Sequence, residues 1–240
     1  MKARLRFLVT CEHGGNRIPA KYWPLFERRR ALLASHRGYD PGALALARDF
    51  ASALGAELVY STTSRLLVEL NRSSHNRQLF SEVTCGLARA EREQILARYY
   101  SPYRQWVEAQ VDDGIASGGR VLHLSCHSFT PKLNGVERRA DVGLLYDPRR
   151  APELAFCTAW QREIRSERPE VVVRRNYPYR GSDDGLTTAL RCRHPQSAYA
   201  GIELEVNQKF PLGDTPAWRA MRKWLIASFQ RAVRNSPAFE

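Results

Sequence analysis

The stretch Leu5-Arg6-Phe7-Leu8-Val9-Thr10-Cys11 runs directly into Glu12-His13-Gly14-Gly15. Its first part has the length and the apolar, β-branched character of a buried strand, and the paired glycines indicate a turn. In α/β sheets, functional groups gather at the carboxyl ends of the strands. Glu12 and His13 are therefore the first residues in which to look for a site.

Further runs of the same kind are found at residues 57–61, 66–70, 121–126, 142–146, 170–173 and 201–206. Helical spacing of apolar residues separates them, at residues 41–54, 88–115, 151–165 and 216–233. Asp40 is expected to cap the first of these helices, with Pro41 at its first position. Residues 88–115 form one helix or two, and in the second case Pro102 restarts the chain behind Ser101. Strands that alternate with helices predict an α/β fold.

Composition narrows the class of protein. The chain has 240 residues, of which 43% are hydrophobic and 26% charged, so a buried core is expected and wholesale disorder is not. We see no internal repeat and no low-complexity linker, and we predict one domain over residues 1–240. The five cysteines are odd in number and show no CxxC spacing, which argues against a disulfide framework and a cysteine zinc ribbon.

The balance of charge is strongly basic, with 37 Lys and Arg against 25 Asp and Glu, a net charge of +12. An arginine-rich nucleic-acid-binding protein is one interpretation, because phosphate neutralisation dominates such binding. The arginines are scattered, however, and the densest run, Arg28-Arg29-Arg30, lies within a predicted helix. No recognition helix, RRM or zinc-finger pattern accompanies them, so we expect no nucleic-acid partner.

The start of the chain has charge but no long apolar core of a signal peptide. No apolar run approaches the ~20 residues that a membrane-spanning helix needs. We therefore expect no membrane partner and a cytoplasmic protein.

The residues that follow the predicted strands include two histidines, His13 and His127, and a carboxylate at Asp40. Two histidines and a carboxylate from separate elements are the usual ligands of a catalytic zinc site with one open position. Glu205 lies on one face of the last strand with Glu203, and a further carboxylate of this kind can serve as general base. By spacing alone each of these residues also fits a structural role, and the same holds for His123.

Several motifs are more specific when taken together. They are Cys11-Glu12-His13-Gly14-Gly15-Asn16-Arg17-Ile18-Pro19, Tyr39-Asp40-Pro41-Gly42-Ala43, Ser64-Arg65-Leu66-Leu67-Val68-Glu69-Leu70-Asn71-Arg72 and His127-Ser128-Phe129-Thr130-Pro131. In this order they resemble the N-formylglutamate amidohydrolase family, from about residue 5 to residue 210. The resemblance implies a fold similar to that of zinc carboxypeptidases and aspartoacylase, a single-domain three-layer sandwich with a mixed β-sheet flanked by helices.

The resemblance also implies one Zn²⁺ per chain, with His13 and His127 as ligands. The carboxypeptidase-type pattern is HxxE, but the third residue after His13 is Asn16, so that carboxylate is missing. Asp40 is the candidate for the third ligand, and Glu12 and Asn16 are the alternatives.

For the reaction, the resemblance implies that Glu205 acts as general base and that Arg65 stabilises the oxyanion. Asn71 and Arg72 match the pair that grips the substrate carboxylate, a task for which a guanidinium fork is suited. The substrate is then a small anionic N-acyl amino acid, with N-formyl-L-glutamate giving formate and glutamate as the archetype. A related hydrolase of another N-acyl amino acid or of a short peptide is the alternative.

One departure concerns the substrate side chain. The family often has Glu-x-Arg where this chain has Glu205-Val206-Asn207, so a cation is missing at that position. Arg139 and Arg180 are the candidates to replace it.

Overall fold

A mixed six-stranded sheet forms the centre of the computed structural model, which describes residues 4–212 and 215–236. The order of its strands is β2-β1-β3-β8-β6-β7. Strands β2, β1, β3 and β8 are parallel to one another, and β6 and β7 run the opposite way. The strands are β1 (Arg4–Cys11), β2 (Glu57–Tyr60), β3 (Gly119–Phe129), β6 (Val142–Leu145), β7 (Val173–Arg175) and β8 (Tyr199–Asn207). A separate hairpin consists of β4 (Lys132–Leu133) and β5 (Val136–Glu137).

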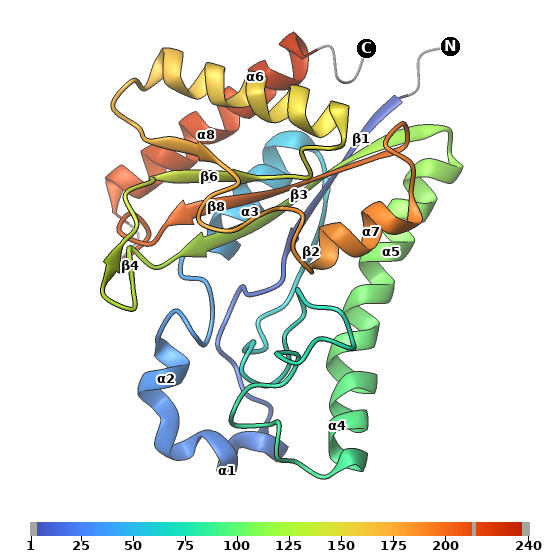
Figure 1. The fold of residues 1–240 in the computed structure, drawn as a ribbon, viewed down its shortest axis with the longest axis vertical. Helices are drawn as coiled ribbons and strands as arrows, with labels where there is room; N and C mark the ends of the chain where they lie inside the picture. The colour runs from blue at the N-terminus through green and yellow to red at the C-terminus, as the bar shows by residue number, and fades with distance from the viewer. Residues whose placement is uncertain (1–3, 213–214, 237–240) are drawn as a thin grey trace.

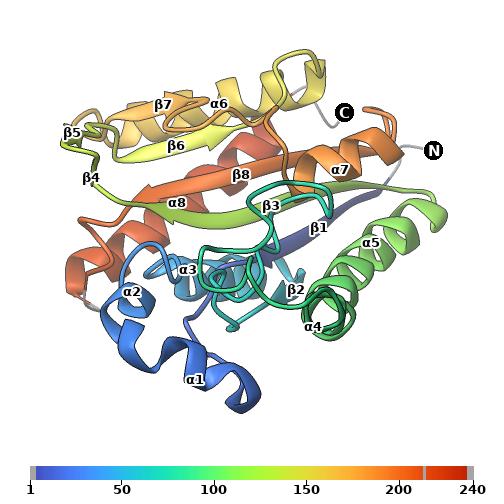
Figure 2. The same ribbon diagram turned by 60° about the horizontal axis from the view of Figure 1, so that its bottom comes forward.

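Helices cover both faces of this sheet (Figures 1 and 2). On one face α3 (Ala43–Leu54), α6 (Ala151–Glu167) and α8 (Pro216–Asn235) bury a core that includes Phe50, Trp160 and Phe229. On the other face, α5 (Ser101–Ala116) and α7 (Leu186–Arg193) pack on a second core. The expected α/β fold with a mixed sheet flanked by helices is confirmed, while the single domain over 1–240 stays a prediction, with residues 1–3, 213–214 and 237–240 outside the described ranges.

The remaining short helices lie beneath one end of the sheet in Figure 1. They are α1 (Trp23–Phe26), α2 (Arg30–Ala34) and α4 (Arg89–Ile95), with 3-10 turns at Ala20–Tyr22 and Glu27–Arg29. Residues 88–115, expected as one helix or two, form a continuous helical segment: a π-helical turn at Leu96–Tyr100 joins α4 to α5, and α5 begins at Ser101 with Pro102 in its first turn. Within the described ranges, no helix combines the length and the apolar character needed to cross a membrane.

The strand expected at residues 66–70 is absent. Leu66, Leu67, Val68 and Leu70 are buried, as the apolar run suggested, but they pack in a loop under the sheet. Their backbone finds partners outside a strand ladder: the Ser81 and Thr84 hydroxyls donate to the Leu66 carbonyl. The apolar run correctly indicated that this segment is buried, but no neighbouring strand among the described residues pairs with it, so the predicted strand does not form. The strand expected at 170–173 overlaps β7 only at its last residue.

The expected capping role of Asp40 is also wrong. Helix α3 begins at Ala43, its N-terminal cap is Gly42, and no side chain bonds to the first turn. Gly42 has a φ of 79°, and a Cβ there would lie 2.2 Å from the Cβ of Pro211. This left-handed turn, which glycine adopts without strain, separates Asp40 from the helix and leaves its carboxylate free for other contacts.

Candidate active site

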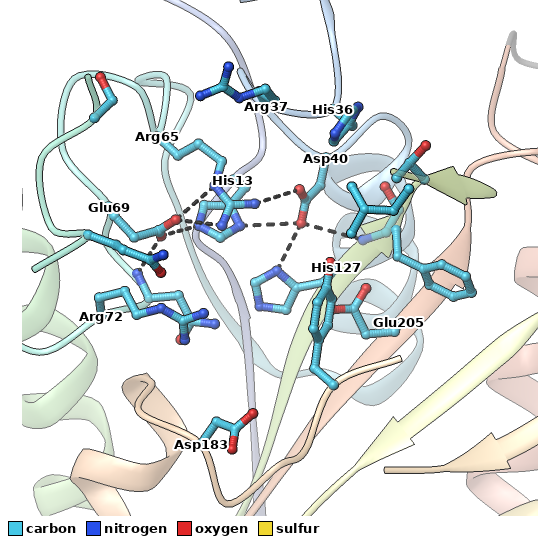
Figure 3. A pocket seen from close by; sticks show the side chains of 18 of the residues that line it. His13, His36, Arg37, Asp40, Arg65, Glu69, Arg72, His127, Asp183 and Glu205 are labelled. Atoms are coloured by element: carbon cyan, nitrogen blue, oxygen red, sulfur yellow. Dashed lines mark hydrogen bonds and ion pairs between the residues drawn. The ribbon is translucent and has the colours of Figure 1, made fainter. Parts of the chain in front are cut away.

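Three neighbouring strands deliver the site. Because β1, β3 and β8 are parallel and adjacent, their carboxyl ends lie at one edge of the sheet. His13 follows β1, His127 lies near the end of β3, and Glu205 is its direct partner in β8. Figure 3 shows Asp40 between the two histidines, with Glu69 on one side and Glu205 on the other.

Asp40 joins the two imidazoles. Its Oδ2 lies 3.3 Å from Nδ1 of His13 and 2.9 Å from Nδ1 of His127. One ligand atom from each of these three residues lies within 4.8 Å of the others, and all three side chains are buried. The structure thus brings together the three residues that the sequence analysis singled out as metal ligands. Asn16 instead donates to the Leu33 carbonyl and does not line the cavity.

A second carboxylate lies behind each histidine. Nε2 of His127 is 3.0 Å from Oε2 of Glu12, and Nε2 of His13 contacts Oε1 of Glu69. A carboxylate accepts this N–H and so keeps the proton on Nε2, which leaves the Nδ1 lone pair for a metal. Glu12 is therefore placed to orient His127 rather than to share a metal with Asp40.

The carboxylates are held ionised by their cationic neighbours. Burial alone would raise the pKa of Asp40, but His13, hydrogen bonds from both histidines and Arg65 hold it well below its usual range. Glu69 is also buried, and Arg65 and His13 keep its pKa low in the same way. The carboxylates of the site are therefore in the ionised form that metal binding requires.

The histidines respond in the opposite direction. Burial lowers the pKa of His127, but hydrogen bonds to Asp40 and Glu12 outweigh it and raise the pKa well above the usual value. Burial and Arg65 lower the pKa of His13, but Glu69 and Asp40 outweigh them, so the pKa of His13 is also raised above its usual value. Each imidazole lies between two carboxylates, which favour its protonated form. The proton on Nδ1 of each histidine occupies the place where a divalent cation could bind, so metal binding would release these protons.

These observations fit a divalent metal. Two imidazole nitrogens and one carboxylate oxygen converge, and three protein ligands with one open position are typical of catalytic zinc sites. The hydrogen-bonded carboxylates behind both histidines complete the arrangement that orients such ligands. His13, Asp40 and His127 could therefore hold the ion.

Glu205 faces this group from β8. It is 5% exposed, and its Oε2 finds no hydrogen-bond partner among the described residues. Burial, with Asp40 and Glu203 nearby, raises the pKa of Glu205 to about 8. Without a metal this carboxyl is therefore mostly protonated at neutral pH. A cation held by His13, Asp40 and His127 would lower the pKa of Glu205, and its unpartnered oxygen could then take a proton from water.

Arg65 occupies the other side of the group. Its Nε donates to Oε2 of Glu69 at 2.7 Å, and its Nη1 lies 3.4 Å from Oδ1 of Asp40. The side chain is 29% exposed, so it is anchored between two carboxylates and still reaches the cavity. A fixed guanidinium in this place can stabilise a developing oxyanion.

The site opens into a cavity of about 850 Å³. Asn71, Arg72 and Arg180 line it, as expected for contacts with an anionic substrate. Nη1 of Arg72 donates to the Asp184 carbonyl, which holds the guanidinium at the cavity wall.

Arg139 lies outside this cavity. Its side chain is 81% exposed, and its Nε lies 3.5 Å from Oε2 of Glu137 in the hairpin. Because Arg139 is exposed and paired with Glu137 outside the cavity, it is not placed to contact the substrate as expected. Asn207, at the position of the missing cation, donates to the carbonyls of Arg138 and Ala140 and serves the backbone.

Glu69 is the site residue that the sequence analysis did not assign. Its signal was a single acidic residue inside the apolar run 66–70, four positions after Arg65. His123 lies outside the site: its ring nitrogens are 2.9 Å from Thr10 Oγ1 and 2.8 Å from Tyr199 Oη, which gives it the contacts of a structural histidine.

Comparisons with known proteins concern the family and the fold. The family model for N-formylglutamate amidohydrolase matches residues 5–211. A curated relative, the N-formylglutamate deformylase of Pseudomonas aeruginosa, is 28% identical over 190 residues, which cover 66% of this chain and 68% of the relative.

Two solved structures have the same fold. A gene product of Agrobacterium tumefaciens matches with a TM-score of 0.83 and 28% identity, covering 97% of this chain and 92% of that one. The N-formylglutamate amidohydrolase from Ralstonia eutropha JMP134 matches with a TM-score of 0.74, covering 98% of this chain and 94% of that one. At 19% identity, this second likeness concerns the fold alone.

Proposed function

The chain belongs to the N-formylglutamate amidohydrolase family, and from this premise we propose that it is a zinc-dependent hydrolase of N-acyl amino acids. N-formyl-L-glutamate, cleaved to formate and glutamate, is the proposed archetype of its substrates. The observation that carries the proposal is the convergence of His13, Asp40 and His127 beside the unpartnered carboxylate oxygen of Glu205. We also propose that the protein works in the cytoplasm.

His13, Asp40 and His127 hold the ion in this proposal. Bound Zn²⁺ supplies Lewis acidity, which polarises a carbonyl group and makes water more acidic. Nδ1 of each histidine faces the site, and Glu69 and Glu12 keep Nε2 protonated. The chain itself thus fixes which ring nitrogen is available.

The substrate is held by its carboxylate. Asn71 is fixed because its Oδ1 accepts a hydrogen bond from the Leu186 amide at 2.8 Å, and Arg72 is fixed by the Asp184 carbonyl. Both line the cavity, so an α-carboxylate between them directs the acyl carbon toward Glu205 and Arg65. Arg180 also lines the cavity and is the candidate for an acidic side chain.

Glu205 moves the proton. Its Oε2 accepts a proton from the attacking water, and the same carboxyl later donates this proton to the departing amine. Arg65 donates hydrogen bonds to the oxygen that gains negative charge when the acyl carbon becomes tetrahedral. Together these steps turn the N-acyl amino acid and water into a carboxylic acid and a free amino acid.

Metal analysis and formate release test the proposal. We expect the purified protein to contain about one zinc per chain, to release formate from N-formyl-L-glutamate and to lose activity to a chelator. His127→Ala removes one ligand and is expected to lose both metal and activity. His75→Ala is the matched control, because His75 is an exposed histidine whose ring contacts Ser73.

The outcomes separate the alternatives. Release of amine from another N-acyl amino acid or a short dipeptide, with none from N-formyl-L-glutamate, would keep the metal hydrolase and change its substrate. A wild-type protein that binds no zinc, or a His127→Ala variant as active as His75→Ala, would overturn the proposal.

A further inference from the structure

Glu69 contacts two parts of the site at once. Its Oε1 accepts hydrogen bonds from Nε2 of His13 and from the Asn71 amide, the latter at 2.9 Å. Its Oε2 accepts from Arg65, with Nε at 2.7 Å and Nη2 at 2.5 Å. The side chain is 8% exposed, so these bonds are shielded from water. Figure 3 shows Glu69 beside His13 and Arg65 on the side of the site away from Glu205.

We propose that Glu69 is a positioning residue that sets the metal-binding nitrogen of His13 through one oxygen and fixes Arg65 through the other. The inference rests on the proposed function for the catalytic role of Arg65. The part that concerns His13 needs only that the site binds metal. Glu69 thereby couples the affinity for the ion to the position of the oxyanion-stabilising group.

An amide cannot replace this carboxylate, because it has one acceptor end and one donor end. If the oxygen of a glutamine at position 69 faces His13 and the Asn71 amide, its NH₂ group meets the N–H groups of Arg65. If the amide is turned, NH₂ faces Nε2 of His13 and favours the tautomer with the proton on Nδ1, the atom that a metal requires. Each orientation therefore impairs one of the two contacts.

Glu12 offers a matched comparison within the same site. It is fully buried and lies behind the other histidine, with Oε2 at 3.0 Å from Nε2 of His127. Its other partners include the hydroxyls of Ser125 and Tyr103, at 2.6 and 2.8 Å, and that of Thr10, so it orients a ligand without contacting Arg65. Loss of Glu12 is expected to affect the metal alone.

The test measures two quantities: the Kd for Zn²⁺ by chelator competition, and kcat for formate release at saturating zinc. We expect Glu69→Gln and Glu12→Gln each to weaken zinc binding about 10- to 100-fold, as loss of such partners does. With zinc saturating, kcat of Glu69→Gln is expected to be at least about tenfold below that of Glu12→Gln, because loss of one oxyanion donor costs about 10²–10³.

A double-mutant cycle with Arg65→Ala separates positioning from a general structural role. In that background, Glu69→Gln is expected to leave kcat unchanged and still to weaken zinc binding. Additive losses in kcat, or a wild-type zinc Kd for Glu69→Gln, would overturn the proposal. If Glu69→Gln does not fold, Glu69→Asp is the second variant: it keeps the charge but is one methylene shorter, so it cannot contact His13 and Arg65 together as Glu69 does. Wild-type values of both quantities for Glu69→Asp would equally overturn the proposal.

Failure of the proposed function gives a different result. A wild-type protein that binds zinc but hydrolyses no N-acyl amino acid would refute the function, while the zinc Kd values would still decide the role of Glu69 toward His13. A crystal structure of Glu69→Gln then decides the role toward Arg65. A guanidinium that keeps its place beside Asp40 would overturn that half.

Discussion

Replacing Glu205 by glutamine is expected to slow the reaction and to stabilise the metal-free protein. The substitution keeps the size of the side chain and removes the proposed base. A general base contributes about 10²–10⁴ in rate. This corresponds to about 3–5 kcal/mol in the activation free energy, so kcat for formate release should fall by that factor.

The gain in stability follows from the pKa of Glu205, which burial raises from its ordinary value of 4.5 to about 8. Between these pH values the folded protein holds a proton that the unfolded chain has lost, so this carboxyl costs more stability as pH rises. The cost is about 1 kcal/mol at pH 5 and about 3 kcal/mol at pH 7 in chelator-treated protein. Glutamine does not titrate and carries no such cost.

Urea unfolding at pH 5 and pH 7 and formate release measure the two effects. Glu203→Gln is the matched control: Glu203 lies on the same face of β8, and its Oε1 accepts from Thr187 Oγ1 at 2.6 Å, a bond that the amide oxygen can keep. Retention of more than a tenth of kcat by Glu205→Gln would refute its role as base. Equal stability of this variant and wild type at pH 7 would refute the reasoning from burial.

Three further expectations concern other parts of the molecule. Burial lowers the pKa of His123 to about 4, so at pH 5 the unfolded chain binds a proton at this histidine that the folded protein lacks. Acidification from pH 7 to 5 should therefore lower the free energy of unfolding by about 2 kcal/mol, and urea unfolding of His123→Gln should show a smaller loss. Arg72→Lys should raise KM for N-formyl-L-glutamate about 10- to 100-fold with kcat nearly unchanged. Lysine lacks the forked guanidinium that binds a carboxylate through two hydrogen bonds, and one charged hydrogen bond contributes about 1.5–3 kcal/mol. A fall in kcat alone would contradict this. Gly42→Ala should destabilise the protein by more than Gly55→Ala: both glycines have positive φ, but a Cβ at position 42 would lie 2.2 Å from the Cβ of Pro211, whereas a Cβ at position 55 would meet no atom within 4 Å. Left-handed strain alone costs about 1–2 kcal/mol, and equal melting temperatures of the two variants would contradict the packing argument.

The central strands could be predicted from the sequence because they are buried along most of their length. Residues 121–126 and 201–206 are apolar runs at the middle of the sheet, and both proved to be strands. The run at 66–70 has the same composition, yet it is buried beneath the sheet by contacts with distant residues. A run of apolar residues predicts that a segment is buried. Whether the segment forms a strand depends on a neighbouring strand with which it can pair, and this is determined by the tertiary structure.

The candidate ligands could be found for a similar reason. His13 and His127 follow strands, and strand ends are where functional groups collect. Asp40 was expected to have two roles, and the left-handed turn at Gly42 separates it from the helix and leaves it to contact the two histidines and Arg65. Glu69 could not be assigned, because its meaning depends on His13, which lies 56 residues earlier in the chain.

The parallel order of β1, β3 and β8 has a consequence for refolding. Parallel pairing joins segments that are distant along the chain, and such contacts form slowly. A chain with β1 and β3 paired but β8 still outside the sheet would already hold His13 and His127 close together, without Glu205. Recovery of zinc binding would then precede recovery of hydrolysis. The interval between the two signals would time the insertion of β8 between β3 and β6.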